Sequence, residues 1–148
     1  MSPVSHVIIS AATSGIFWSF IPSWSGTLAC FLSGIFLDLD HHFDYYLNKK
    51  AIPLSYKKLL SFSEKEKAGK PYLFLHSYEL LALFWFSIFY FQWGPLWGGL
   101  AVGITVHIIA DQLCNPVRPL SYFLLYRIKH EFHRGKLLTE KHYQTLQE

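Results

Sequence analysis

Histidine and aspartate residues gather at the ends of the long apolar stretches of this sequence. In chain order the groups are His6; Asp38, Asp40, His41 and His42; His76 with Glu79; and His107 with Asp111. His107 and Asp111 are four residues apart, so on a helix their side chains share one face and can bind the same ion. Imidazole and carboxylate together suit zinc, and also iron or manganese. These residue types predict a site for one or two divalent metal ions, with zinc as the ion expected first.

A metal site of this kind would serve hydrolysis. An ion with an open coordination position makes its bound water a nucleophile near neutral pH, and a carboxylate outside the ligand set can act as general base. We expect Glu79, one helical turn after His76, or a spare aspartate, Asp38, to be that base. His42 and Asp44 are expected at the surface. The expected metal ligands are His6, Asp38, Asp40, His41, His76, His107 and Asp111.

The apolar stretches that must position these side chains predict membrane-spanning helices. Residues 1–37 and 80–110 contain no Lys, Arg, Asp or Glu, and uncharged runs of about 18 residues or more are transmembrane candidates. Charged residues make up 16% of the chain, against about 25% in soluble domains. We therefore expect an all-α polytopic membrane protein, a four-helix transmembrane bundle that forms a single membrane domain over residues 1–148.

Turn residues divide the apolar sequence into four spans, because Pro22 and the Gly94-Pro95 pair interrupt it. The expected spans cover about residues 4–21, 25–46, 72–93 and 96–114. A basic loop, residues 48–71, is expected between the second and third spans, and a basic tail, residues 116–148, after the fourth. The tail predicts one or two helices that lie at the membrane interface.

If the four spans cross the membrane in alternate directions, every group of candidate ligands lies on the same side. All 13 Lys and Arg residues also lie on that side, in the loop and the tail. The positive-inside rule then makes it the cytoplasmic side, with both termini in the cytoplasm. We expect an integral protein of the bacterial inner (cytoplasmic) membrane whose basic segments contact anionic lipids.

In their order along the chain, these motifs resemble the YdjM-like family of predicted membrane-bound metal-dependent hydrolases. The resemblance spans residues 1–115 and rests on His6, Asp38-Leu39-Asp40-His41, His76-Ser77 and the His107-to-Asp111 spacing. This chain has Leu37 where the family has a proline, and residues 71–75 lack the His-Arg pair that the family has before its His-Ser. The family's distant similarity to zinc-dependent phospholipase C and related nucleases implies a phosphoester substrate, including a lipid-linked one.

Two other interpretations of the polar groups stay open. The chain could be a membrane metal-binding or metal-handling protein without catalysis, although the ionisable residues lie at one end of the spans only, which argues against a conduit for ions. It could also be a structural or interaction subunit in which the same side chains form a buried hydrogen-bonded network. The net charge of +3 is explained by topology, so no nucleic-acid partner is expected. The sequence predicts no particular oligomeric state.

Overall fold

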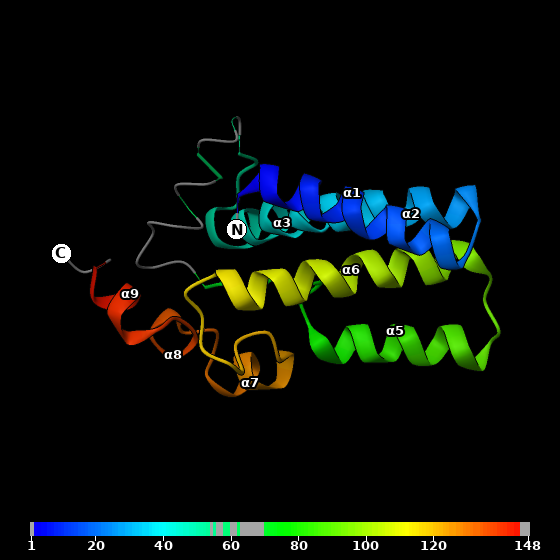
Figure 1. Ribbon diagram of the computed structural model, residues 1–148. Helices are drawn as coiled ribbons and strands as arrows, with labels where there is room; N and C mark the ends of the chain where they lie inside the picture. The colour runs from blue at the N-terminus through cyan, green and yellow to red at the C-terminus, as the bar shows by residue number, and fades with distance from the viewer. Residues whose placement is uncertain (1, 54, 56–57, 60–61, 63–69, 146–148) are drawn as a thin grey trace. The chain divides into compact units, whose positions relative to one another are not determined.

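Helices make up most of the residues that the computed structural model describes, which are 2–53, 55, 58–59, 62 and 70–145 (Figure 1). These ranges contain no β-strand, and within them an isolated β-bridge joins Val117 to Leu138. The all-α fold expected from the sequence is therefore confirmed. The chain divides into unit 1, Met1–Leu37 with Tyr78–Asn115, and unit 2, Asp38–Ser77 with Pro116–Glu148, which are described separately.

Unit 1 is built from four helices. They are α1 (Pro3–Phe20), α2 (Trp24–Phe36), α5 (Tyr78–Tyr90) and α6 (Pro95–Cys114). In Figure 1 the four helices run lengthwise beside one another, and α6 packs against each of the other three. Serine caps begin two of them, because the Ser2 and Ser23 hydroxyls accept hydrogen bonds from the backbone N–H groups of Ser5 and Gly26.

Small residues bring α2 and α6 into close contact. A Cβ atom added to Gly99 would meet the Gly26 carbonyl, and one added to Gly103 would meet the Cys30 carbonyl. Nothing lies within 4 Å of the corresponding position on Gly98, although the sequence places it in the same small-residue run. Ser33 adds a hydrogen bond from its hydroxyl to the Leu100 carbonyl at 3.0 Å. This close approach of backbones is typical of helices packed in membranes.

Unit 1 buries several polar side chains among apolar ones and exposes many large apolar side chains. On α1, Ser10 and Ser14 are buried. Large apolar side chains point outward, with Phe20 81% exposed, Trp24 79% and Phe89 67%. Among the described helices, α6 is long and apolar enough to cross a membrane, whereas α5 is a shorter apolar helix. The four-span bundle remains a prediction.

The helices depart from the expected spans in two places. The second span was expected to run to residue 46, but α2 ends at Phe36, a 3₁₀ turn (η1, Leu37–Leu39) follows, and a new helix, α3 (Asp40–Lys49), begins. The third was expected to start at residue 72, yet α5 starts at Tyr78. Residues 70–77 are not helical, and the N–H groups of Lys70, Tyr72 and Leu75 bond to side chains of α3. Two short-range backbone bonds, from Tyr72 to Lys70 and from His76 to Leu73, complete the turn.

The tail adds three short helices to unit 2, where one or two were expected. They are α7 (Leu124–Lys129), α8 (Arg134–Leu137) and α9 (Glu140–Thr145). Backbone hydrogen bonds fold the tail back on itself, from Arg118 N–H to the Leu137 carbonyl and from Thr139 N–H to the Pro116 carbonyl. Much of the predicted basic loop, including residues 63–69, lies outside the described residues.

Candidate metal centres

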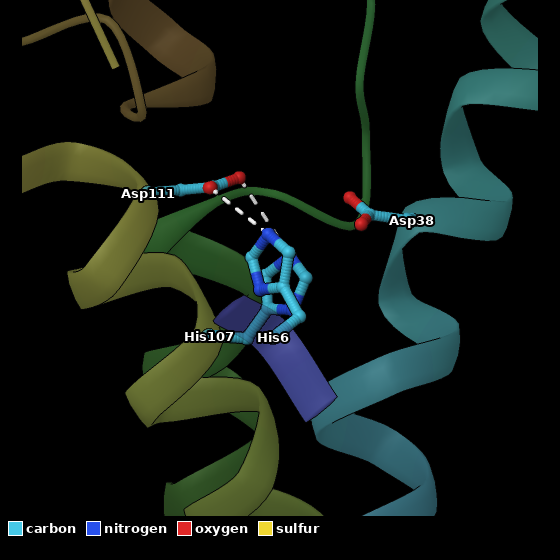
Figure 2. Close-up of side chains that lie close together, drawn as sticks. All are labelled: His6, Asp38, His107 and Asp111. Carbon is cyan, nitrogen blue, oxygen red and sulfur yellow. Dashed lines mark ion pairs between the residues drawn. The ribbon is translucent and has the colours of Figure 1, made fainter. Parts of the chain in front are cut away.

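Unit 1 brings together His6, His107 and Asp111, a group we call the unit 1 cluster. The Asp111 carboxylate faces both histidines, with Oδ1 3.3 Å from His6 Nε2 and Oδ2 3.6 Å from His107 Nε2 (Figure 2). The two imidazole rings are stacked with their centroids 4.0 Å apart. All three side chains are buried, and one ligand atom from each lies within 4.8 Å of the others. This group could hold a divalent metal ion.

The helices of unit 1 explain why these three side chains meet. His107 and Asp111 are one turn apart on α6, and His6 lies on the buried face of α1 that also carries Ser10 and Ser14. Asp111 stands in the last turn of α6, where the helix macrodipole disfavours a negative charge and favours a cation. A bound cation would therefore offset two unfavourable terms, the interaction of the Asp111 carboxylate with the helix dipole and the cost of burying its charge.

The tautomer of His107 follows from its backbone contact. His107 Nδ1 lies 2.7 Å from the Gly34 carbonyl oxygen. A carbonyl can only accept a hydrogen bond, so Nδ1 carries the proton and donates. The other ring nitrogen, His107 Nε2, faces Asp111 and is the acceptor when the ring is neutral. This arrangement, with one imidazole nitrogen held by an acceptor and the other available for a metal, recurs in histidine metal sites.

Unit 2 brings together Asp38, His41 and His76, a group we call the unit 2 cluster. Asp38 Oδ1 lies 3.5 Å from His41 Nε2 and 3.8 Å from His76 Nε2. Their ligand atoms also lie within 4.8 Å of one another, so this group too could hold a divalent ion. His76 is buried, whereas the Asp38 side chain is 35% exposed. Asp38, also labelled in Figure 2, is the first residue of unit 2.

Asp40 stands behind His76 as a hydrogen-bond acceptor. Its Oδ2 accepts the backbone N–H of Leu75 at 2.8 Å and lies 3.2 Å from His76 Nδ1. The Asp40 carboxylate is thus the hydrogen-bond partner of His76 Nδ1. The other ring nitrogen, His76 Nε2, faces Asp38. Asp40 was expected as a direct ligand. Among the described residues it belongs to neither cluster, and its carboxylate lies against His76 Nδ1, as carboxylates often do beside metal-binding histidines.

One face of α3 holds the segment that carries His76. Asp40, Asp44 and Asn48 are spaced four apart, so their side chains line one side of the helix. Asn48 exchanges two hydrogen bonds with the Lys70 backbone, at 2.7 and 2.8 Å, and Asp44 Oδ1 accepts Tyr72 N–H at 2.7 Å. The sequence analysis missed this face, although the four-residue spacing of its polar residues was visible.

Asp44 is buried, which corrects the expectation that it lies at the surface. Burial raises the pKa of its carboxyl group from 3.8 to about 6, and the hydrogen bond from Tyr72 N–H opposes that rise. Nearby Asp40 adds to the increase, and the charge of Arg134 reduces it. The other residue expected at the surface, His42, is exposed.

Glu79, the expected general base, lies in the first turn of α5 and is half-buried. It belongs to neither cluster among the described residues. Asp38, the other candidate base, is the carboxylate of the unit 2 cluster and is partly exposed. Comparisons of the chain with family models, with curated proteins and with solved structures found no match. The geometry of the two clusters therefore has to carry the functional argument.

Proposed function

We propose that this protein is a membrane-embedded, metal-dependent hydrolase that binds divalent metal, with zinc as the expected ion, in its unit 1 and unit 2 clusters and cleaves phosphoesters at the cytoplasmic face. The observation that carries the proposal is the unit 1 cluster. Two imidazoles and one carboxylate from α1 and α6 converge there inside an apolar helical unit. Ionisable side chains at such depth are unfavourable without a partner of opposite charge, and they mark functional sites.

The distances within the clusters suit an ion better than direct hydrogen bonds. Charge-assisted N–H···O hydrogen bonds are about 2.7–2.9 Å long. The four imidazole–carboxylate contacts measure 3.3, 3.6, 3.5 and 3.8 Å. Ligands about 2.0–2.1 Å from a tetrahedral zinc ion are separated by about 3.3 Å. A zinc ion would therefore fit between these groups with small adjustments of the side chains, which favours metal binding over a hydrogen-bonded network.

The orientation of two histidines supports the same proposal. Nδ1 of His107 meets the Gly34 carbonyl, and Nδ1 of His76 meets the Asp40 carboxylate. In both rings the second nitrogen, Nε2, faces a carboxylate of its own cluster. Each cluster draws three protein ligands from its own unit, and a zinc ion that kept a further coordination position for water would resemble catalytic zinc sites.

The surface of unit 1 supports the proposed place in the membrane. Its exposed side chains include many large apolar ones, such as Phe20 and Phe89. Soluble monomers rarely expose contiguous apolar patches of more than a few hundred Å². Lipid would cover these side chains, and α6 provides one helix that can cross a bilayer. We extend this proposal to four spans and an inner-membrane location, because all Lys and Arg residues fall in the loop and the tail.

The reaction we propose is attack of water on a phosphoester. A bound divalent ion supplies a polarised water and neutralises negative charge on the phosphate oxygens. Asp38, which is partly exposed, can accept a proton at the surface of its cluster, and Glu79 is the second candidate for that role. The phosphoester class, lipid-linked substrates included, rests on the basic loop and tail and on the family resemblance described above.

Metal analysis combined with hydrolysis assays tests this function. Protein purified in detergent without chelator should contain divalent metal, and it should cleave bis-p-nitrophenyl phosphate. His107→Ala and Asp111→Ala should lose the unit 1 ion and the activity. His42→Ala removes an exposed histidine and should retain both. A wild-type protein that binds no divalent metal, or activity that survives both unit 1 substitutions, would contradict the proposal.

A second candidate function is metal binding without catalysis. It is supported by the clusters themselves, because their side chains could hold divalent ions whether or not a reaction follows. The two functions differ in one result. A protein that holds its ions tightly but leaves phosphodiester, phosphomonoester and phospholipid probes intact over hours would be a metal-handling protein.

A further inference from the structure

The segment that carries His76 has a shape that its own sequence does not favour. Residues 71–77 form a turn between α3 and α5 with no regular structure. Within it Leu73 has a φ angle of 39°, in the left-handed region that residues other than glycine adopt with difficulty. Such conformations persist when surrounding contacts impose them, and they cluster at functional sites. The contacts that impose the conformation of Leu73 come from Arg127 and from α3.

Arg127 of α7 holds three backbone carbonyls of this segment. Its Nη1 atom donates to the carbonyl oxygens of Tyr72 at 2.6 Å and of Leu73 at 2.7 Å. Its Nη2 atom donates to the carbonyl oxygen of His76 itself at 2.9 Å. The partners are 51 to 55 residues away in sequence, so these bonds are tertiary contacts. The side chain is only 2% exposed, which leaves it out of reach of a substrate phosphate.

We propose that Arg127 is the positioning residue of the unit 2 cluster. Its guanidinium group fixes the His76 carbonyl and the strained turn before it, so that His76 Nε2 meets the metal ion beside Asp38 and His41. The inference rests on the proposed function, because it requires the unit 2 cluster to bind metal. It adds a residue that the sequence analysis had placed only in a basic tail.

Two opposed sets of bonds hold the His76 segment. From α3, the carboxylates of Asp44 and Asp40 bind the N–H groups of Tyr72 and Leu75. From α7, Arg127 binds the carbonyl groups. Loss of the α7 side would leave three carbonyl groups without their guanidinium donor and release the turn toward its preferred conformations.

A metal site is sensitive to such a release. Metal–ligand distances must hold within about 0.2 Å, so a small movement of the His76 backbone would weaken the bond to the ion. Lysine could not replace Arg127 fully, because the planar guanidinium fork binds several acceptors at once whereas an ammonium group acts as a single point charge.

The experiment compares Arg127→Met and Arg127→Lys with Arg134→Met in the full-length, detergent-purified protein. Arg134 is the control, since it is also buried on the neighbouring helix α8, but its guanidinium donates to the Phe62 carbonyl at 3.1 Å. Its charge also acts on Asp44, so the titrations are run at pH 8, above the pKa of about 6 of that carboxyl group. Co²⁺ is the probe, because its visible absorption reports ligand number and geometry. The unit 1 cluster, titrated in the same samples, reports whether the rest of the protein is folded. Hydrogen exchange of residues 72–77 gives a readout that needs no metal.

The expected results are specific to Arg127. Arg127→Met should weaken Co²⁺ binding at the unit 2 cluster by about 10- to 100-fold, the range for groups that orient metal ligands. Arg127→Lys should give a smaller loss, and methylguanidinium should restore part of the affinity of the Met variant. Hydrogen exchange should accelerate at Leu75, whose N–H bonds to Asp40. Arg134→Met and the unit 1 cluster should keep wild-type Co²⁺ affinity.

The outcomes separate this inference from the function on which it rests. Wild-type protein that binds no Co²⁺ at either cluster would overturn both. Wild-type protein that fills both clusters, with Arg127→Met filling them at unchanged affinity, would overturn the inference alone. Faster exchange in Arg127→Met without any change in Co²⁺ affinity or spectrum would give Arg127 a purely structural role and would also overturn it.

Discussion

The Asp44 carboxyl group should make the protein less stable as the pH rises from about 4 to about 6. Its pKa is raised from 3.8 to about 6 in the folded state because it is buried. The unfolded chain therefore loses this proton at a lower pH than the folded protein does. Below pH 3.8 both states are protonated and Asp44 has no effect. Above about pH 6 the folded protein must hold a buried negative charge.

The size of this effect follows from the change in pKa. A rise from 3.8 to about 6 corresponds to about 3 kcal/mol of destabilisation above pH 6, relative to the protonated form. Asp44→Asn removes the titration and retains an oxygen that can accept the Tyr72 N–H bond. Relative to the wild type, the Asn variant should gain stability steadily between pH 4 and pH 6 and keep a constant difference from pH 6 to pH 8.

Reversible denaturant unfolding in detergent micelles, repeated at intervals from pH 4 to pH 8, measures this difference. Subtracting the two curves cancels the titrations that do not depend on the charge of Asp44. What remains is the titration of Asp44 and its coupling to neighbours such as Asp40. The reasoning would be refuted if the difference were independent of pH, or if the wild type gained stability over Asp44→Asn as the pH rose. The first result would mean that the neighbours of the buried carboxylate offset the effect of burial, and the second that they outweigh it.

Three further predictions concern the metal ions and the helix contacts. Chelator should lower the melting temperature, because an ion present at about 100 times its Kd stabilises the folded state by about 2.7 kcal/mol; an unchanged melting curve after proven metal removal would count against bound ions. Gly99→Ala should destabilise unit 1 by about 1–3 kcal/mol through the clash with Gly26, whereas Gly98→Ala should not, as denaturant unfolding will show. Asp40→Asn should weaken metal binding at the unit 2 cluster by about 10- to 100-fold and leave the unit 1 cluster unchanged, which a competitive titration with a zinc indicator would detect.

The meeting of His6 with His107 and Asp111 was foreseeable in kind from the sequence. The four-residue spacing on one helix pairs His107 with Asp111, and alternate helix directions bring the start of α1 to the end of α6. The position of these polar residues at the ends of long apolar stretches was what predicted a shared site. The same logic indicated His76 and Asp38, which do lie close to each other in unit 2.

The support around the clusters could not be predicted in the same way. Residues 72–77 continue an apolar, aromatic run and favour a helix locally, but bonds to Asp44, Asp40 and Arg127 impose an extended turn. Arg127 looked like one more basic residue in a charged tail, and only a tertiary contact shows that its guanidinium is buried. Tertiary contacts of this kind override local preference, and single-sequence patterns do not encode them.

The metal content of the purified protein is the most direct measurement of what this chain does. Elemental analysis of detergent-purified protein, prepared without chelator and then equilibrated with zinc and desalted, should find two ions per chain. His107→Ala and His76→Ala should each retain one ion, because each removes a ligand from a different cluster. A wild-type protein without stoichiometric divalent metal after this treatment would show that the histidines and aspartates are assembled for another purpose.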